Sequence, residues 1–273
     1  MSAPTGRRGW DCHAHLFGPY DRYPLAADRS YTPPPAVAPD YAALLDRLGL
    51  AHGVLVQPSA YGADHGLLLD ALAAHPGWRG VAVLRAAGAA QLRTLRARGI
   101  RGLRFSHRSA PAGNFAGSAG LDDLVSLAPA MAQAGLHAEL WTDTAALEAA
   151  APLLSALPVA VVIDHMGGFD VAAGVEAPGF LALLRLLETG RVWVKLCAYR
   201  NLLAVADWEA GQPFQRALQH TAADRLVWGS DWPHLRVQPA PQTAALLELF
   251  QRWSGGPEMV RRVLEDNATQ LYG

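Results

Sequence analysis

The segment Leu226-Val227-Trp228-Gly229-Ser230-Asp231 begins as an apolar run and ends in polar residues. Parallel barrels of strands and helices carry their chemistry at the carboxyl ends of the strands, so this order predicts a barrel strand that delivers Asp231 to a site. A second polar segment, Trp10-Asp11-Cys12-His13-Ala14-His15-Leu16, lies near the start of the chain. Side chains two apart in a strand share a face, so we expect His13 and His15 to project together.

Apolar runs alternate with amphipathic stretches along the whole chain. The runs that predict strands are Trp10–Leu16, Gly53–Gln57, Gly80–Leu84, Ile100–Phe105, His137–Trp141, Val159–Asp164, Val192–Leu196 and Leu226–Gly229. The stretches that predict helices are Tyr41–Leu48, His65–Ala74, Ala89–Arg98, Leu121–Ala134, Thr144–Ala156, Gly179–Glu188, Pro213–Thr221, Ala240–Trp253 and Met259–Leu264. Eight strand and helix units predict an α/β protein with a (β/α)8 barrel. A doubly wound sheet is the main alternative, but Val56-Gln57-Pro58-Ser59 lacks the glycine-rich turn that it favours.

Composition restricts the class of protein. The chain has 273 residues, 51% of them hydrophobic, which is enough for one large core, and we expect a single domain over residues 1–273. No apolar run reaches the roughly 18 residues of a membrane span, and Met1–Gly9 is polar, so we expect a soluble, cytoplasmic protein. A net charge of −1 with scattered basic residues argues against a nucleic-acid partner and favours a small molecule. The oligomeric state stays open.

Prolines crowd the connection from Phe17 to Pro39, at positions 19, 24, 33, 34, 35 and 39. A segment so rich in proline cannot be helical, because the ring removes a backbone donor and clashes with the preceding turn. Directly after the first strand it would lie over the barrel mouth, so we interpret residues 17–39 as a rim loop, with a plain surface extension as the alternative.

Polar side chains recur at the carboxyl ends of the predicted strands: His13, His15, Ser59, Tyr61, Arg104, His107, Arg108, Trp141, His165, Tyr199, Arg200, Asp231 and His234. Stability alone does not explain so many histidines and arginines at one rim. His13, His15 and Asp231 could share one divalent metal, zinc or manganese, because imidazole nitrogen and carboxylate oxygen suit both ions. His165 could be a fourth ligand or could polarise a carbonyl group.

Neighbouring side chains are assigned by strand alternation. Asp11 should lie one step behind His13 on the same face, whereas Asp164 should face away from the site that His165 enters. Lys195, the only lysine, lies within the seventh predicted strand and is expected to pair with a buried carboxylate. A hydrolase that bridges two metals through a carbamylated lysine on its fourth strand is excluded, because no lysine lies there.

Two arginines predict the charge of the ligand. Arg104 and Arg200 end strands across the mouth from each other, and a guanidinium fork is a natural receptor for a carboxylate, so the expected substrate is a small organic anion. Arg108 and Arg236 fall in loops and are expected to be solvated surface charges. The other candidate substrate-binding residues at the rim are Ser59, Tyr61, Trp141, Tyr199 and His234.

Five motifs in order carry a resemblance to a known family: Asp11-Cys12-His13-Ala14-His15 with Phe17-Gly18-Pro19, Tyr31-Thr32-Pro33-Pro34, Val162-Ile163-Asp164-His165-Met166-Gly167-Gly168, Lys195-Leu196-Cys197-Ala198-Tyr199-Arg200 and Trp228-Gly229-Ser230-Asp231-Trp232-Pro233-His234. The chain resembles the amidohydrolase superfamily, in the group around 2-pyrone-4,6-dicarboxylate lactonase. This resemblance implies a distorted TIM barrel that hydrolyses a lactone or a related ester-like bond in a small carboxylated ring or a sugar acid.

The resemblance also implies roles for the site residues. His13, His15 and His165 would polarise the lactone carbonyl, Asp231 would take a proton from the attacking water, and Arg104 and Arg200 would hold substrate carboxylates. Metal-dependent members commonly end strand five in a histidine, but Glu139-Leu140-Trp141 occupies that end here. The resemblance therefore implies that no cofactor is required, and the alternative is one zinc or manganese ion on His13, His15 and Asp231.

Three other functions remain open at this stage. A metal-dependent hydrolase or decarboxylase of an aromatic or muconate-like acid would use the same fold, and so would a lactone isomerase. A barrel that only binds an organic acid through Arg104 and Arg200 is a third alternative. The presence of Asp231 beside the histidines argues against it.

Overall fold

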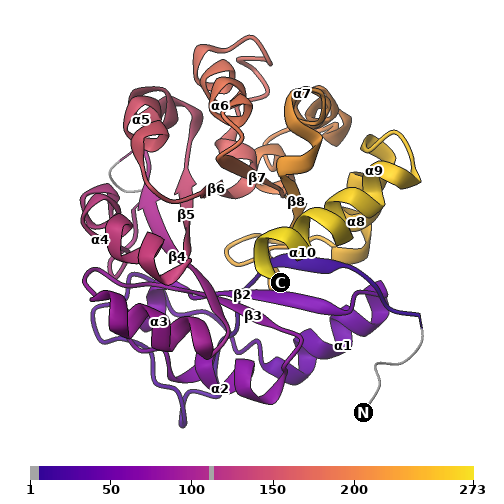
Figure 1. Cartoon of the computed structure of the whole chain (residues 1–273). Helices are drawn as coiled ribbons and strands as arrows, with labels where there is room; N and C mark the ends of the chain where they lie inside the picture. Colours follow the sequence, from indigo (N-terminus) through magenta and orange to yellow (C-terminus); the bar gives the residue numbers. More distant parts are fainter. Residues whose placement is uncertain (1–5, 111–113) are drawn as a thin grey trace.

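Eight parallel strands form the centre of the computed structural model, which describes residues 6–110 and 114–273 (Figure 1). Residues 1–5 of the N-terminal stretch that we expected to be polar lie outside the described residues. The strands pair in chain order: β1 Trp10–Ala14, β2 His52–Val56, β3 Arg79–Ala82, β4 Ile100–His107, β5 His137–Thr142, β6 Val161–Ile163, β7 Val192–Leu196 and β8 Leu226–Trp228. The sequence predicts all eight.

Helices surround these strands on the outside, as Figure 1 shows, and complete a (β/α)8 barrel. They are α1 Ala38–Leu48, α2 Gly66–Ala74, α3 Ala89–Ala97, α4 Leu121–Ala134, α5 Thr144–Ala156, α6 Pro178–Glu188, α7 Gln212–Ala222, α8 Thr243–Trp253, α9 Pro257–Arg261 and α10 Asn267–Tyr272. The fold class predicted from the sequence is confirmed. Among the described residues, no helix has the length and apolar character needed to cross a membrane.

The barrel closes where β1 meets the chain that follows β8. Ala14 pairs with Trp232 in a parallel bridge. The backbone N–H of His15 donates to the Trp232 carbonyl at 2.8 Å, and the N–H of Asp231 donates to the His13 carbonyl at 2.8 Å. These bonds hold the two polar segments of the sequence side by side at the carboxyl ends of the strands.

A β-bulge in β1 overturns the expectation for Asp11. Between Asp11 and Ala14 the register with β2 shifts by one residue. The extra residue breaks the alternation of faces, so Asp11 lies on the opposite face from the histidines. Its carboxylate accepts hydrogen bonds from Tyr41 of α1, at 3.1 Å, and from the hydroxyl of Ser230, at 2.6 Å. Asp11 therefore fastens β1 to α1 and to the end of β8.

An apolar cluster fills part of the barrel interior below the mouth. Trp10, Cys12, Trp193 and the inward valines of β2, β3, β6 and β8 pack there. Helix α10, which the sequence analysis missed, supplies Ala268 and Tyr272 to the same cluster. The helix thus closes the floor of the barrel, opposite the mouth.

The proline-rich segment folds back on itself beside the mouth. Phe17 and Ala36 exchange two backbone hydrogen bonds of 2.8 Å, and Tyr20 donates to the Pro33 carbonyl at 2.7 Å. Phe17 and Ala36 pack with Tyr61 in a small apolar cluster of their own. The segment brings Tyr31 to the cavity described next.

Candidate active site

A cavity of about 470 Å³ opens at the carboxyl ends of the strands. Seven of the predicted site residues line it: His15, Ser59, Arg104, Trp141, His165, Arg200 and Asp231. Its wall also includes Tyr31, Phe115, Asn201 and two arginines, Arg108 and Arg236. The lining of the cavity is thus basic. Among the described residues, its one carboxylate is that of Asp231, a residue that the sequence predicts for the site.

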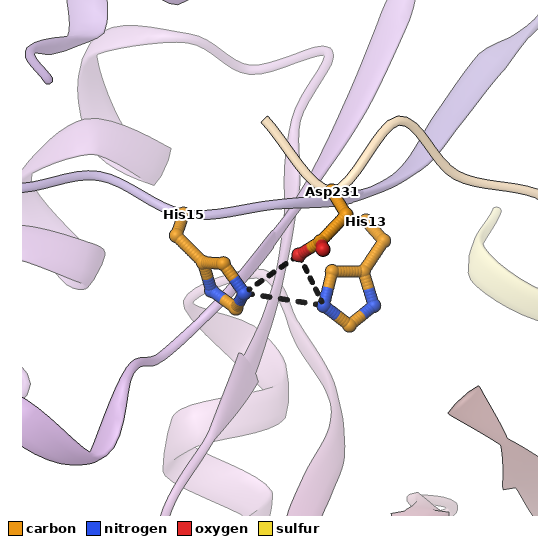
Figure 2. Close-up of side chains that lie close together, drawn as sticks. All are labelled: His13, His15 and Asp231. Atoms are coloured by element: carbon orange, nitrogen blue, oxygen red, sulfur yellow. Dashed lines mark hydrogen bonds and ion pairs between the residues drawn. The ribbon is translucent and has the colours of Figure 1, made fainter. Parts of the chain in front are cut away.

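The side chains of His13, His15 and Asp231 point toward one another, as Figure 2 shows. His13 Nε2 lies 3.3 Å from His15 Nε2 and 3.8 Å from Asp231 Oδ1, and His15 Nε2 lies 3.4 Å from Asp231 Oδ1. His15 and Asp231 line the cavity, but His13 is fully buried behind them. His13 is therefore placed to act through its neighbours rather than on a ligand directly.

The spacing of these three atoms is that of a metal site. Tetrahedral zinc with bonds of about 2.0–2.1 Å separates its ligand atoms by about 3.4 Å. His13, His15 and Asp231 could each offer one ligand atom, and so could two overlapping groups that contain His165. Spacing alone does not decide the matter, because each nitrogen must also have a free lone pair.

Asp231 is held as a carboxylate by its surroundings. Burial would raise its pKa, but Arg200 and the neighbouring histidines hold the pKa well below its usual range. The Arg200 guanidinium pairs with Oδ2, which also accepts a hydrogen bond of 2.7 Å from the Tyr199 hydroxyl. Asp231 remains ionised at neutral pH.

His13 and His165 are neutral at neutral pH. Burial, helped by the Lys195 charge, lowers the pKa of His13 to about 4. Burial also lowers the pKa of His165 well below its usual value. His165 Nδ1 is buried and has no hydrogen-bond partner among the described residues, while Asn201 donates to its backbone carbonyl at 2.9 Å. An unpartnered imidazole nitrogen beside a cavity is available to a ligand.

Asp164 and Lys195 lie behind the histidines. Lys195 Nζ contacts Glu139 Oε2 at 2.5 Å, which confirms the expected pairing with a buried carboxylate. Asp164 Oδ1 lies 3.3 Å from both His13 Nδ1 and Lys195 Nζ, so the expectation that Asp164 faces away is wrong. The backbone turns left-handed at His165, with φ of 49°, and this lets two consecutive side chains face the site.

Left-handed backbone is concentrated around the cavity. The non-glycine residues with positive φ among the described residues are His165, Met166, Asp231, His234 and Arg236. They all lie in the loops that follow β6 and β8. Residues other than glycine rarely adopt this backbone conformation. It persists where the surrounding structure enforces it, often at functional sites.

Three predicted substrate-binding residues lie behind the cavity wall that the described residues form. Tyr61 accepts a hydrogen bond of 2.8 Å from the Gly18 N–H, and Tyr199 donates to Asp231. His234 Nε2 lies 2.9 Å from the Thr243 hydroxyl. These residues support the wall and the carboxylate instead of lining the cavity.

Arg108 and Arg236 both line the cavity. Arg236 is exposed, as expected for a solvated charge, whereas Arg108 is half-buried. Arg108 lies 4.8 Å above the Trp141 ring and 3.5 Å from Asp143, and Arg236 lies 5.3 Å above the Phe115 ring. The aromatic faces fix these loop side chains in place, and the only sequence signal was their position shortly after a strand.

The sequence profile of the amidohydrolase family matches residues 10–273. The chain is 35% identical over 286 residues to the 4-sulfomuconolactone hydrolase of Rhizobium radiobacter, and the alignment covers 100% of this chain and 92% of that protein. It is 32% identical over 275 residues to the 2-pyrone-4,6-dicarboxylate hydrolase of Comamonas testosteroni, covering 96% and 89%.

Solved structures share the fold. A proposed 2-pyrone-4,6-dicarboxylic acid hydrolase from Pseudomonas putida has a TM-score of 0.85 and 32% identity, and the match covers 97% of each chain. An amidohydrolase from Burkholderia multivorans, solved with bound zinc, has a TM-score of 0.72 and 19% identity over 97% of this chain and 99% of that one. The barrel is thus common to proteins that include a zinc-bound one.

Proposed function

Because the chain belongs to the amidohydrolase family, we propose that it hydrolyses the ester bond of a lactone in a small carboxylated ring or a sugar acid. The observation that carries the proposal is the floor of the cavity, where Asp231 lies beside His15 and His165 under several arginines. The two relatives named above are lactone hydrolases by name, and their substrates are small acids.

Asp231 acts as the base in this proposal. Water adds to the lactone carbonyl carbon while its proton passes to Asp231, a general-base step. The low pKa that Arg200 imposes would make Asp231 a weak base. A substrate carboxylate that draws the Arg200 guanidinium toward the cavity removes this restraint, because the fork then serves two anions. The substrate thus activates its own base.

The carbonyl oxygen is stabilised by the imidazoles in this proposal. His165 is neutral, and an N–H of its ring can donate to the oxygen as negative charge develops there, which is where fixed donors lower the barrier most. The ring C–O bond then breaks, the ring oxygen takes up the proton held by Asp231, and a hydroxy acid leaves.

The arginines select the substrate in this proposal. Arg104 and Arg200 lie beside the buried carboxylates of Asp164 and Asp231, and Arg108 and Arg236 add positive charge to the cavity lining. Guanidinium groups bind carboxylates and related anions in a bidentate manner. We therefore expect a small organic acid with one or two anionic groups.

Metal use is the main alternative within this function. We propose that no metal is required. The alternative is one zinc or manganese ion on His13, His15 and Asp231, as in a metal-dependent hydrolase or decarboxylase, and it is favoured by the spacing of the three ligand atoms.

A substrate panel tests the proposed function. Purified protein, dialysed against a chelator and then assayed with and without added zinc or manganese, is offered carboxylated lactones, sugar-acid lactones and their neutral methyl esters. Proton release at constant pH reports ring opening. The proposal expects turnover of at least one anionic lactone in the chelator-treated sample, with poor turnover of its ester. Activity that appears only with metal would support the alternative, and no activity on any lactone would contradict the proposal.

A further inference from the structure

We infer that Lys195 is a positioning residue that fixes the ring hydrogen of His13 on Nε2 and thereby prevents His13, His15 and Asp231 from acting as a metal site. The inference goes beyond the proposed function, because it concerns the hydrogen-bond polarity of the site and holds for any substrate. It rests on a chain of contacts that runs from the barrel interior to the edge of the cavity.

Lys195 stands at the inner end of this chain. Its side chain is fully buried, and Nζ lies 3.1 Å from His13 Nδ1 and 2.5 Å from Glu139 Oε2. Burial alone would lower the pKa of Lys195, but Glu139 and Asp164 raise it above its usual value. An ammonium group has three donors and no acceptor, so Nδ1 of His13 must accept. A neutral imidazole that accepts through Nδ1 carries its hydrogen on Nε2.

The Val56 carbonyl stands at the outer end. His15 Nδ1 lies 2.7 Å from this oxygen, which has no hydrogen to give. His15 therefore carries a hydrogen on Nδ1, and in its neutral form Nε2 keeps its lone pair.

The middle contact agrees with both ends. His13 Nε2 and His15 Nε2 lie 3.3 Å apart, and a hydrogen bond between them needs one donor and one acceptor. Lys195 makes His13 the donor, and Val56 makes His15 the acceptor. The chain thus runs from ammonium to His13 to His15 to carbonyl with one consistent direction.

Asp164 offers the competing arrangement. Its Oδ1 lies 3.3 Å from His13 Nδ1 and would accept a hydrogen from that nitrogen. Within the described residues, however, neither oxygen of Asp164 is aligned for a hydrogen bond. A hydrogen on Nδ1 would also point toward the Lys195 ammonium, which lies closer. The geometry favours the chain that begins at Lys195.

The consequence is a donor set that does not fit a divalent ion. A histidine that binds metal through Nε2 normally donates its other ring N–H to a carboxylate, a carbonyl or a water. His15 meets this condition, but His13 faces an ammonium and holds a hydrogen where the ion would sit. Lys195 also places a positive charge one imidazole ring away from that position.

Two measurements without substrate test the inference, so its failure is distinguishable from failure of the proposed function. Long-range proton–nitrogen correlation NMR of histidine-labelled protein at pH 7.5 reads the tautomer of His13, whose signals are assigned by their loss in His13→Gln. We expect the Nε2–H tautomer. An Nδ1–H tautomer or an imidazolium at this position would overturn the inference.

Zinc binding to the chelator-treated protein is the second measurement, by calorimetry. We expect Lys195→Met paired with Glu139→Gln, which removes both charges of this buried pair and leaves Asp164 beside Arg104, to bind zinc at least about tenfold more tightly than wild type, a gain that His13→Gln abolishes. Tyr272→Phe removes a different donor to Glu139, the Tyr272 hydroxyl at 2.7 Å, and is the matched control that should keep wild-type affinity. Equal zinc affinity in wild type and the double variant would overturn the inference.

Discussion

At the scale of single residues, Asp231 is the group on which the proposed chemistry depends. Asp231→Asn keeps the shape of the side chain but removes the acceptor for the water proton, so we expect kcat to fall by at least about a hundredfold in a folded protein. The measurement is proton release with the best lactone of the panel. Asp224→Asn is the control, because Asp224 pairs with Arg225 and its side chain is 60% exposed, so its activity should match wild type. A folded Asp231→Asn protein with near-normal kcat would rule out this base.

Arg104 is the residue that tests anion recognition. Its side chain is only 16% exposed and lines the cavity. Arg104→Met keeps much of the apolar stem and removes the fork, and the lost carboxylate contact should lower kcat/KM by roughly 1.5–3 kcal/mol, or about ten- to a hundredfold. The same substitution at Arg93, an exposed residue of α3, is the control. If Arg104→Met still prefers the acid over its ester as strongly as wild type does, Arg104 does not read the charge.

Sequence patterns predicted some of these residues and not others. His13 and His15 face each other as predicted, whereas Asp11 points to α1 because the register of β1 shifts between Asp11 and Ala14. Strand alternation also failed at Asp164, since a left-handed turn follows directly. Loops without a fixed direction carry Arg108 and Arg236, and only the folded chain places them over aromatic rings. The periodicity of hydrophobic residues therefore predicts where strand side chains point, but it does not predict the placement of loop side chains.

At the scale of elements, α10 connects the barrel floor to the residues behind the site. The Tyr272 hydroxyl donates to the buried Glu139 carboxylate at 2.7 Å. Tyr272→Phe leaves that carboxylate short of a donor and should lower the free energy of unfolding by about 1–3 kcal/mol in chemical denaturation. Tyr23→Phe removes a comparable bond of 2.8 Å to Asp70 at the surface and should cost less than about 0.5 kcal/mol. Equal losses would mean that α10 does not stabilise the floor.

Most elements were predictable, because the barrel repeats one pattern. The predicted bounds of α4, α5 and β7 agree with the structure, and the bounds of the other strands differ by a few residues. Helix α10 was missed because it is short and follows Arg262–Asp266, a π-helical turn that breaks the period. Its apolar residues face the barrel floor, a partner that local sequence does not reveal.

At the scale of the whole molecule, the buried charges make stability depend on pH. The folded pKa of His13 and of His234 is about 4, against 6.5 for an unfolded histidine, and that of His165 is also lowered. The unfolded chain therefore binds more protons below pH 6.5, and stability falls as pH drops from 6.5 toward 4. Asp11 has the opposite effect, because burial raises its pKa from 3.8 to about 6. The folded protein therefore gains a proton on Asp11 as pH falls below 6, and this offsets part of the loss of stability.

The expected net change is a loss of a few kcal/mol between pH 7 and pH 5, since His13 and His234 each contribute roughly 1–2 kcal/mol and Asp11 returns about 1. Urea denaturation at pH 7, 6 and 5 measures it. His234→Gln removes one of the three groups and should flatten the profile. A midpoint that stays constant or rises toward pH 5 would contradict the burial of neutral histidines.

The measurement that tests the central claim most directly follows the oxygen of water. The chelator-treated protein is incubated with an anionic lactone in water enriched in oxygen-18, and the product is analysed by mass spectrometry. Hydrolysis at the carbonyl predicts a ring-opened hydroxy acid that carries one heavy oxygen, in its new carboxylate, and the Asp231→Asn protein should form little of it. A product lactone without heavy oxygen would mean isomerisation, and loss of carbon dioxide would mean decarboxylation. Either result would contradict lactone hydrolysis by water that Asp231 activates.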